Sequence, residues 1–148
     1  MQTAHIGINV TNLERSRDFY GEVFGLSDMG GSGGGSDAAP RRFAFLGDGT
    51  NIVLTLWEQS EGRFENNRPG LHHLSFKVPS IDHVREAEKK LLLRGATFAY
   101  EGIVPHAEGA QSGGIFFEDP DGSRLEIFAP VGAGEQKAPG EGPTCGFF

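Results

Sequence analysis

The chain has 148 residues, with 13 lysine and arginine residues against 20 acidic ones and a net charge of -7 at pH 7. A chain of this length can bury a core without disulfides or a structural metal, so a bound metal would serve chemistry. The net negative charge repels nucleic-acid phosphates and anionic lipid, so we expect neither as a partner. No apolar run reaches the ~20 residues that span a bilayer and no signal-peptide pattern opens the sequence, so we expect a cytoplasmic protein.

The first half of the chain shows a strand, a helix and a hairpin. The predicted strand at residues 5–10 opens with a histidine, and residues 11–14 have the spacing of a capping box for the helix that follows. A glycine-rich segment, residues 30–36, contains no lysine, so we interpret it as a flexible connection and not as a phosphate-binding loop. Turn residues at 47–50 then separate two apolar strands. One face of the predicted helix carries the apolar residues Leu13, Tyr20, Val23 and Phe24.

The second half repeats this pattern 68 residues later. Residues 70–78 read GLHHLSFKV, and His73 stands where His5 stands in the first half. Ser80 can cap the next helix, and Asp-Pro-Asp-Gly at 119–122 predicts a hairpin before the last strand. We therefore predict an α+β fold of two repeated βαβββ modules, about residues 3–58 and 70–129, within a single domain over residues 1–130. The modules would form a curved mixed sheet around a metal site.

The remaining residues, 131–148, are rich in proline and glycine and predict a flexible tail. The tail contains the single cysteine of the chain, Cys145, and this count excludes an internal disulfide framework. We interpret Cys145 as an incidental thiol.

The two adjacent histidines in GLHHLSFKV cannot both ligate one small ion, because successive side chains of an extended chain point to opposite faces. His73 matches His5 and is the inward candidate, whereas His72 is predicted to point away. Glu126 lies inside an apolar strand, where a carboxylate is costly unless it is paired or bound to a cation. Two histidines and one carboxylate with open positions suit non-haem Fe2+, and also Mn2+, Ni2+, Co2+ or Zn2+.

Each candidate ligand also has a structural interpretation. His5 could be a surface histidine, His73 a hydrogen-bonded core histidine, and Glu126 an ion-pair partner of Arg124 or Lys77. The joint occurrence of the three residues at matching positions favours metal binding.

The chain resembles the vicinal oxygen chelate superfamily, which includes glyoxalase I, extradiol dioxygenases, and fosfomycin and bleomycin resistance proteins. The resemblance covers about residues 3–129 and lies in HIGINVTNLERSRDFYGEVFGL, GLHHLSFKV and GGIFFEDPDGSRLEIF. It implies that His5, His73 and Glu126 bind a divalent metal, for which we favour Fe2+. It also implies a homodimer whose sites are shared between subunits.

The first repeat offers no fourth ligand of the kind that glyoxalase I enzymes use. The position symmetric to Glu126 falls at Val53, or at Leu54 or Thr55 if the register slips, and Glu58 would need a larger shift. Three ligands leave room for a substrate that chelates the metal through two vicinal oxygens, which favours dioxygenase-like chemistry. A glyoxalase-like lyase or isomerase and a resistance-type transferase are the alternatives. A metal-free protein that binds an antibiotic or metabolite is another, although it would not need the three ligands.

Four further residues are candidates for contact with a small-molecule substrate. His106 and Tyr100 precede the last hairpin and are candidates for catalysis, because relatives carry pocket histidine and tyrosine residues. Trp57 and Ser112 are candidates for substrate binding. Each of them could instead belong to the core or the surface.

Overall fold

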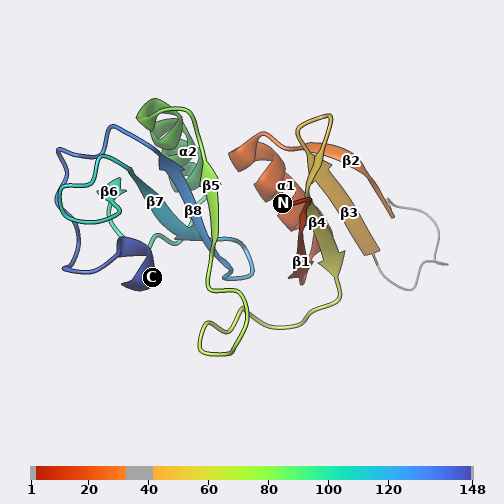
Figure 1. The fold of residues 1–148 in the computed structure, drawn as a ribbon. Helices are drawn as coiled ribbons and strands as arrows, with labels where there is room; N and C mark the ends of the chain where they lie inside the picture. Colours follow the sequence, from red (N-terminus) through yellow and green to blue (C-terminus); the bar gives the residue numbers. More distant parts are fainter. Residues whose placement is uncertain (1–2, 33–41, 148) are drawn as a thin grey trace. The chain divides into compact units, whose positions relative to one another are not determined.

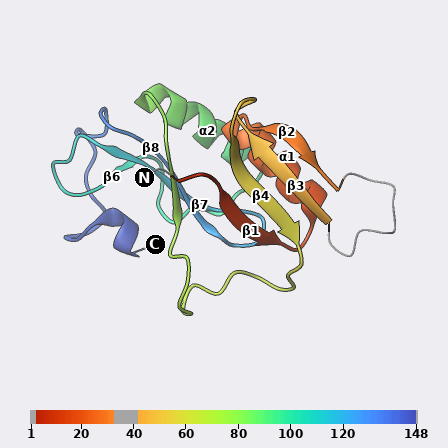
Figure 2. The ribbon, with the colours of Figure 1, turned by 45° about the vertical axis from the view of Figure 1, so that its right-hand side comes forward.

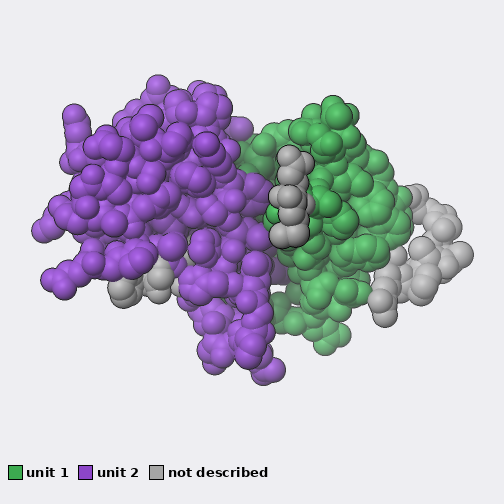
Figure 3. Space-filling view, viewed as in Figure 1, with its two compact units in different colours: residues 1–63 green, residues 64–148 purple. Residues whose placement is uncertain are grey.

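A computed structural model describes residues 3–32 and 42–147 of the protein. The chain divides into two compact units, Met1–Arg63 and Phe64–Phe148, which Figure 3 colours separately. Each unit contains one of the two predicted repeats (Figure 1). Within the described ranges, no helix is long and apolar enough to cross a membrane.

Unit 1 contains one helix and a four-stranded mixed sheet. The strands lie in the order β1-β4-β3-β2, with β1 parallel to β4 and the other neighbours antiparallel (Figures 1 and 2). The helix packs on β3 and β4 through an apolar face that includes the buried residues Leu13, Tyr20 and Val23. The elements of unit 1 are β1 (Ile6–Val10), α1 (Leu13–Phe24), β2 (Ser27–Gly31), β3 (Arg42–Gly47) and β4 (Ile52–Glu58).

The start of α1 is fixed by two side chains. Asn12 is the N-cap, and its Oδ1 accepts a hydrogen bond from the Arg15 backbone N–H at 2.9 Å, so the cap lies one residue after the predicted Thr11. Glu58 Oε2 accepts from the Leu13 backbone N–H at 2.6 Å, which ties the end of β4 to the helix N-terminus.

Unit 2 repeats this arrangement. Its strands lie in the order β5-β8-β7-β6, with β5 parallel to β8 and the other neighbours antiparallel. The DPDG turn joins β7 to β8 as predicted, with Gly122 at a positive φ of 88°. The prediction of an α+β fold with two βαβββ modules is thus confirmed, and each module has its own four-stranded sheet. The elements of unit 2 are β5 (Leu74–Lys77), α2 (Ile81–Leu93), β6 (Val104–Pro105), β7 (Gly113–Glu118), β8 (Arg124–Ala129) and a short 3-10 helix (Thr144–Phe147).

The glycine-rich segment begins inside a strand. β2 includes Gly30 and Gly31, whereas we expected a flexible connection from Gly30 onward. A Cβ atom at Gly31 would lie 2.3 Å from the Phe43 carbonyl oxygen, so glycine is what permits β3 to approach this closely. The segment from residue 33 to 36 lies outside the described residues.

The segment that follows β8, which we expect to be a flexible tail, makes hydrogen bonds with the rest of unit 2. We call residues 131–145 the C-terminal strap, because they pack on unit 2 through hydrogen bonds. The Thr144 backbone N–H donates to the His106 carbonyl at 2.9 Å, and the Thr144 hydroxyl donates to the Pro105 carbonyl at 2.6 Å. Ala133 is fully buried and its N–H donates to the Gln111 carbonyl at 3.0 Å. The strap is anchored by small and polar side chains, which an apolar periodicity does not reveal.

We expect Thr144→Val to destabilise the protein by about 1 to 3 kcal/mol, because it removes the buried hydroxyl donor and leaves an acceptor unpaired. Thermal unfolding followed by circular dichroism measures this loss. Thr50→Val, in the exposed turn between β3 and β4, is the matched control and should leave the melting temperature nearly unchanged. Equal melting temperatures for the two variants would show that the Thr144 contact contributes nothing to stability.

Candidate metal centre

Glu126 is the centre of a polar cluster in unit 2. Its neighbours along β8, Leu125 and Ile127, are buried and point to the opposite face of the sheet. The carboxylate belongs to a residue that is only 3% exposed, and both of its oxygens face histidine rings. Oε1 lies 2.5 Å from His106 Nε2, and Oε2 lies 3.7 Å from His73 Nε2. The buried carboxylate is therefore partnered by histidine nitrogens.

His73 precedes β5 and is half-buried. Burial lowers the pKa of His73, the Glu126 carboxylate opposes this by raising it, and His72 and Arg124 lower it further. The net lowering of the pKa favours the neutral imidazole, which is the form that can ligate a metal.

His72 contacts the ring of His73. Its Nδ1 lies 2.8 Å from His73 Nδ1, and the two rings meet edge to face with centroids 5.0 Å apart. Both residues precede β5, which begins at Leu74, so the strict alternation of a strand does not apply to them. His72 remains exposed to solvent.

His106 and Ser112, which were predicted separately, lie together. His106 Nδ1 is 2.9 Å from Ser112 Oγ, while Nε2 of the same ring contacts Glu126. The ring also packs against Phe128, with centroids 5.1 Å apart. The result is a continuous line of hydrogen-bonding groups from Ser112 through His106 to Glu126.

Tyr100 lies at the strap. Its hydroxyl donates to the Thr144 carbonyl at 2.9 Å, and its ring meets Phe116 edge-on at 5.6 Å. Burial raises the pKa of Tyr100, so the hydroxyl keeps the proton that it donates. These contacts give Tyr100 a structural role in holding the strap.

In unit 1, the counterpart of Glu126 is Thr55. Gly7 pairs with Thr55 in the β1-β4 register, and Ser75, which stands at the same repeat position as Gly7, pairs with Glu126. Of the three positions considered from the sequence, the register therefore selects Thr55 and not Val53, because the stretch between the first and last strands differs in length between the repeats. Thr55 carries a hydroxyl and not a carboxylate, so this position offers no fourth carboxylate ligand.

The other predicted residues of unit 1 are placed as follows. His5 precedes β1 and is exposed. Trp57 is half-buried, stacks on Phe43 with centroids 5.1 Å apart, and donates from Nε1 to Thr55 Oγ1 at 3.1 Å. Glu58 accepts from Leu13 and from Arg42, so it is committed to the helix start.

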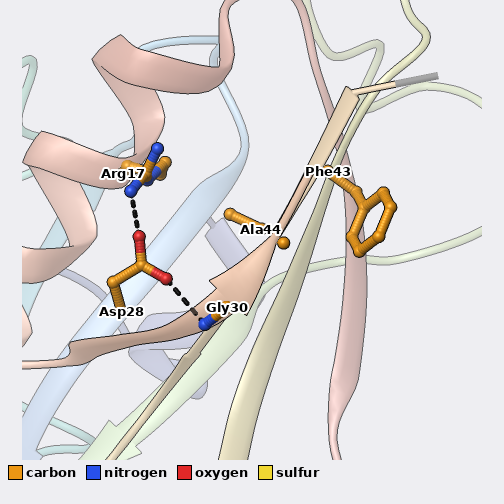
Figure 4. A pocket seen from close by; sticks show the side chains of 6 residues that line it. Arg17, Asp28, Gly30, Phe43 and Ala44 are labelled. Carbon is orange, nitrogen blue, oxygen red and sulfur yellow. Dashed lines mark hydrogen bonds and ion pairs between the residues drawn. The ribbon is translucent and has the colours of Figure 1, made fainter. Parts of the chain in front are cut away.

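A cavity of about 230 Å³ in unit 1 contains none of the predicted site residues. Figure 4 shows an ion pair between Arg17 and Asp28 at this cavity, and Asp28 Oδ1 also accepts from the Gly30 N–H at 2.8 Å. Arg17, Asp28 and Gly30 thus interact with one another at the wall of the cavity. Its lining residues are Arg17, Asp28, Gly30, Gly31, Phe43 and Ala44.

Two of the predicted metal ligands lie near each other in unit 2. Across residues 3–32 and 42–147, no group of three or more His, Cys, Asp or Glu side chains is placed to hold a metal. Unit 2 nevertheless brings together two of the three predicted ligands, His73 and Glu126, while His5 belongs to unit 1. Two donors bound to one ion at about 2.1 Å lie roughly 3 to 3.5 Å apart, which is close to the 3.7 Å between His73 Nε2 and Glu126 Oε2.

Comparison with known proteins gives a consistent result. The model of the Glyoxalase/Bleomycin resistance protein/Dioxygenase superfamily matches residues 2–127. A trivalent organoarsenical cleaving enzyme from Bacillus sp. (strain MD1) is 30% identical over 147 residues, which is 98% of this chain and 83% of the relative. A catechol-2,3-dioxygenase from Bacillus subtilis (strain 168) is 26% identical over 133 residues, which is 86% of this chain but 42% of the relative.

Two solved structures show the same fold. A glyoxylase/bleomycin resistance protein/dioxygenase domain from Frankia sp. EAN1pec has a TM-score of 0.69 at 26% identity, covering 87% of this chain and 91% of the other. A mutant of the fosfomycin resistance protein FosX from Listeria monocytogenes, with Mn(II) and 1S,2S-dihydroxypropylphosphonic acid, has a TM-score of 0.68. Its identity is 19%, and the match covers 88% of this chain and 92% of the other.

Proposed function

The chain belongs to the glyoxalase/bleomycin resistance protein/dioxygenase superfamily, and we propose that it is an enzyme in which His5, His73 and Glu126 hold a divalent metal. The observation that carries this proposal is the buried Glu126 carboxylate, whose Oε2 faces His73 Nε2 at 3.7 Å. A metal held there supplies Lewis acidity to a substrate that presents two adjacent oxygens.

For the reaction, we favour dioxygenase-like cleavage of a catechol-type substrate with Fe2+. Thr55 in place of a fourth carboxylate leaves coordination positions open, and one relative is a catechol-2,3-dioxygenase. The same residue disfavours a glyoxalase-like lyase or isomerase, which would need the fourth ligand. We also place a resistance-type transferase behind the dioxygenase-like reaction. A metal-free binding protein would not need a buried carboxylate between two histidines, so we also disfavour this alternative.

Residues of the cluster support proton transfer to and from such a substrate. His106 contacts the ligand Glu126 through Nε2 and is oriented through Nδ1 by Ser112 Oγ. Because both ring nitrogens are engaged, His106 would take a proton from a substrate hydroxyl at Nε2 only where the substrate replaces the Glu126 contact, and would return it to the product. The stacked rings of Trp57 and Phe43 offer a flat apolar surface that suits an aromatic substrate.

Cleavage of trivalent organoarsenicals is the second candidate. It is favoured by the relative that is 30% identical over 98% of this chain. Against it stands the chemistry of trivalent arsenic, which binds thiolates in preference to oxygen. This chain has one cysteine, Cys145, which packs against the cluster of Val104 and Phe116. We therefore favour a catechol-type substrate over a trivalent organoarsenical.

Oxygen uptake by anaerobically purified, Fe2+-loaded protein tests the proposed function. We expect oxygen consumption and a coloured ring-cleavage product with catechol. Arsenite release from a trivalent arylarsenical, without turnover of catechol, would favour the second candidate. Failure of the iron-loaded protein with both substrates would contradict the dioxygenase-like assignment.

His106→Gln should lower kcat by about 100-fold or more while the iron content stays the same, because it removes the proton-transfer group and not a ligand. The control is His83→Gln, which changes a histidine on α2 that bonds to Ser80. A kcat equal to that of the unmodified protein would show that His106 takes no part in proton transfer.

A further inference from the structure

We propose that His72 positions His73 for metal binding, acting as the hydrogen-bond acceptor that fixes the orientation and tautomer of the ligand ring. This inference rests on the proposed metal site. It starts from the Nδ1 to Nδ1 distance of 2.8 Å between the two rings, which is a hydrogen-bonding distance.

The direction of this hydrogen bond follows from the other side of the His73 ring. His73 Nε2 faces Glu126 Oε2 at 3.7 Å, so Nε2 is the nitrogen aimed at the metal position. A ligating nitrogen needs its lone pair, so the proton of a neutral His73 must lie on Nδ1. Nδ1 of His73 then donates, and Nδ1 of His72 accepts with its own proton on Nε2.

Metal-ligating histidines generally donate their second ring N–H to an acceptor that sets the ring orientation. The His72 imidazole lies at hydrogen-bonding distance from His73 Nδ1, so it is the acceptor that the geometry offers. His72 is exposed, which leaves its Nε2–H free to be hydrated. Of the adjacent histidines in GLHHLSFKV, His73 would thus bind the metal, and His72 would fix the orientation of the His73 ring.

An exposed hydrogen bond between neighbouring rings could also be incidental, and the choice of substitution separates the two cases. Asparagine places Oδ1 where histidine places Nδ1, so His72→Asn keeps an acceptor without an imidazole. Alanine removes the acceptor. A positioning role predicts that asparagine rescues metal affinity and alanine does not.

The experiment measures the dissociation constant for Co2+ by chelator competition, together with the visible absorption spectrum of the Co2+ form. We expect His72→Ala to weaken binding by about 10- to 100-fold and to alter the spectrum. We expect His72→Asn to recover most of the affinity. Melting temperatures of the metal-free variants should be equal, and His83→Ala, an exposed histidine on α2, should bind Co2+ as the unmodified protein does.

Two outcomes overturn the inference while leaving the metal site intact. They are an unchanged Co2+ affinity in His72→Ala, and a His72→Asn variant as weak as His72→Ala. Co2+ binding that survives His73→Ala, or no binding by the unmodified protein, would instead overturn the proposed metal site and the role of His72 with it.

Discussion

Replacing Glu126 by alanine is expected to abolish stoichiometric binding of a divalent metal, and His73→Ala and His5→Ala should do the same. The reason is that three protein ligands are the minimum for tight binding at an open catalytic site, so no spare ligand compensates for the loss. Elemental analysis after anaerobic loading with Fe2+ and gel filtration measures the metal content. Glu101→Ala, which removes an exposed carboxylate from the same unit, is the control and should keep one metal per chain.

Loss of metal through unfolding must be separated from loss of a ligand. Glu126 contacts His106 at 2.5 Å, so alanine at this position leaves Nε2 of a half-buried histidine without this contact. Glu126→Gln keeps the shape of the side chain and removes the charge, and circular dichroism of both variants reports folding. A folded His72→Ala protein that contains no metal, beside a His73→Ala protein that retains it, would contradict the assignment of ligands.

The elements that the sequence predicted correctly are those with local signals. The DPDG turn and the apolar strands around it predict β7 and β8, because turn chemistry and alternation act within a few residues. The apolar face of α2, formed by Val84, Ala87 and Leu91, likewise follows from a helical period. The superfamily and the two modules could therefore be recognised from the sequence.

The features that the sequence did not predict depend on contacts between distant residues or on backbone outside regular structure. The strap is held by Thr144, whose partners Pro105 and His106 lie far away in the sequence. The contact between His72 and His73 arises because both precede the strand that would have separated them. In each case a few polar groups make the interaction, and composition alone does not identify them.

The cluster around Glu126 was predicted in part. The carboxylate was identified because it interrupts the apolar strand RLEIFA, and His73 because it matches His5. His106 was identified only as a pocket candidate, although it makes the shorter contact with Glu126, at 2.5 Å. It lies between β6 and β7, and its position depends on the contact with Ser112, which directly precedes β7.

Division of the ligands between the units leads to a prediction about assembly. His5 belongs to unit 1, whereas His73 and Glu126 belong to unit 2. We propose that the protein is a homodimer in which unit 1 of one subunit and unit 2 of the other complete each site. A mixed dimer of His5→Ala and Glu126→Ala chains then contains one intact site and one site with both changes, whereas each homodimer contains no intact site.

Mixing the two inactive variants in equal amounts, under conditions that allow subunit exchange, should therefore restore about a quarter of the metal content and activity of the unmodified protein, because half of the dimers are mixed and each has one site. Native mass spectrometry of one isotopically labelled variant demonstrates the exchange. The control mixes His73→Ala with Glu126→Ala, where both changes lie in unit 2 and neither site of any dimer is intact. Demonstrated exchange without recovery in the first mixture would show that each site is built within a single chain.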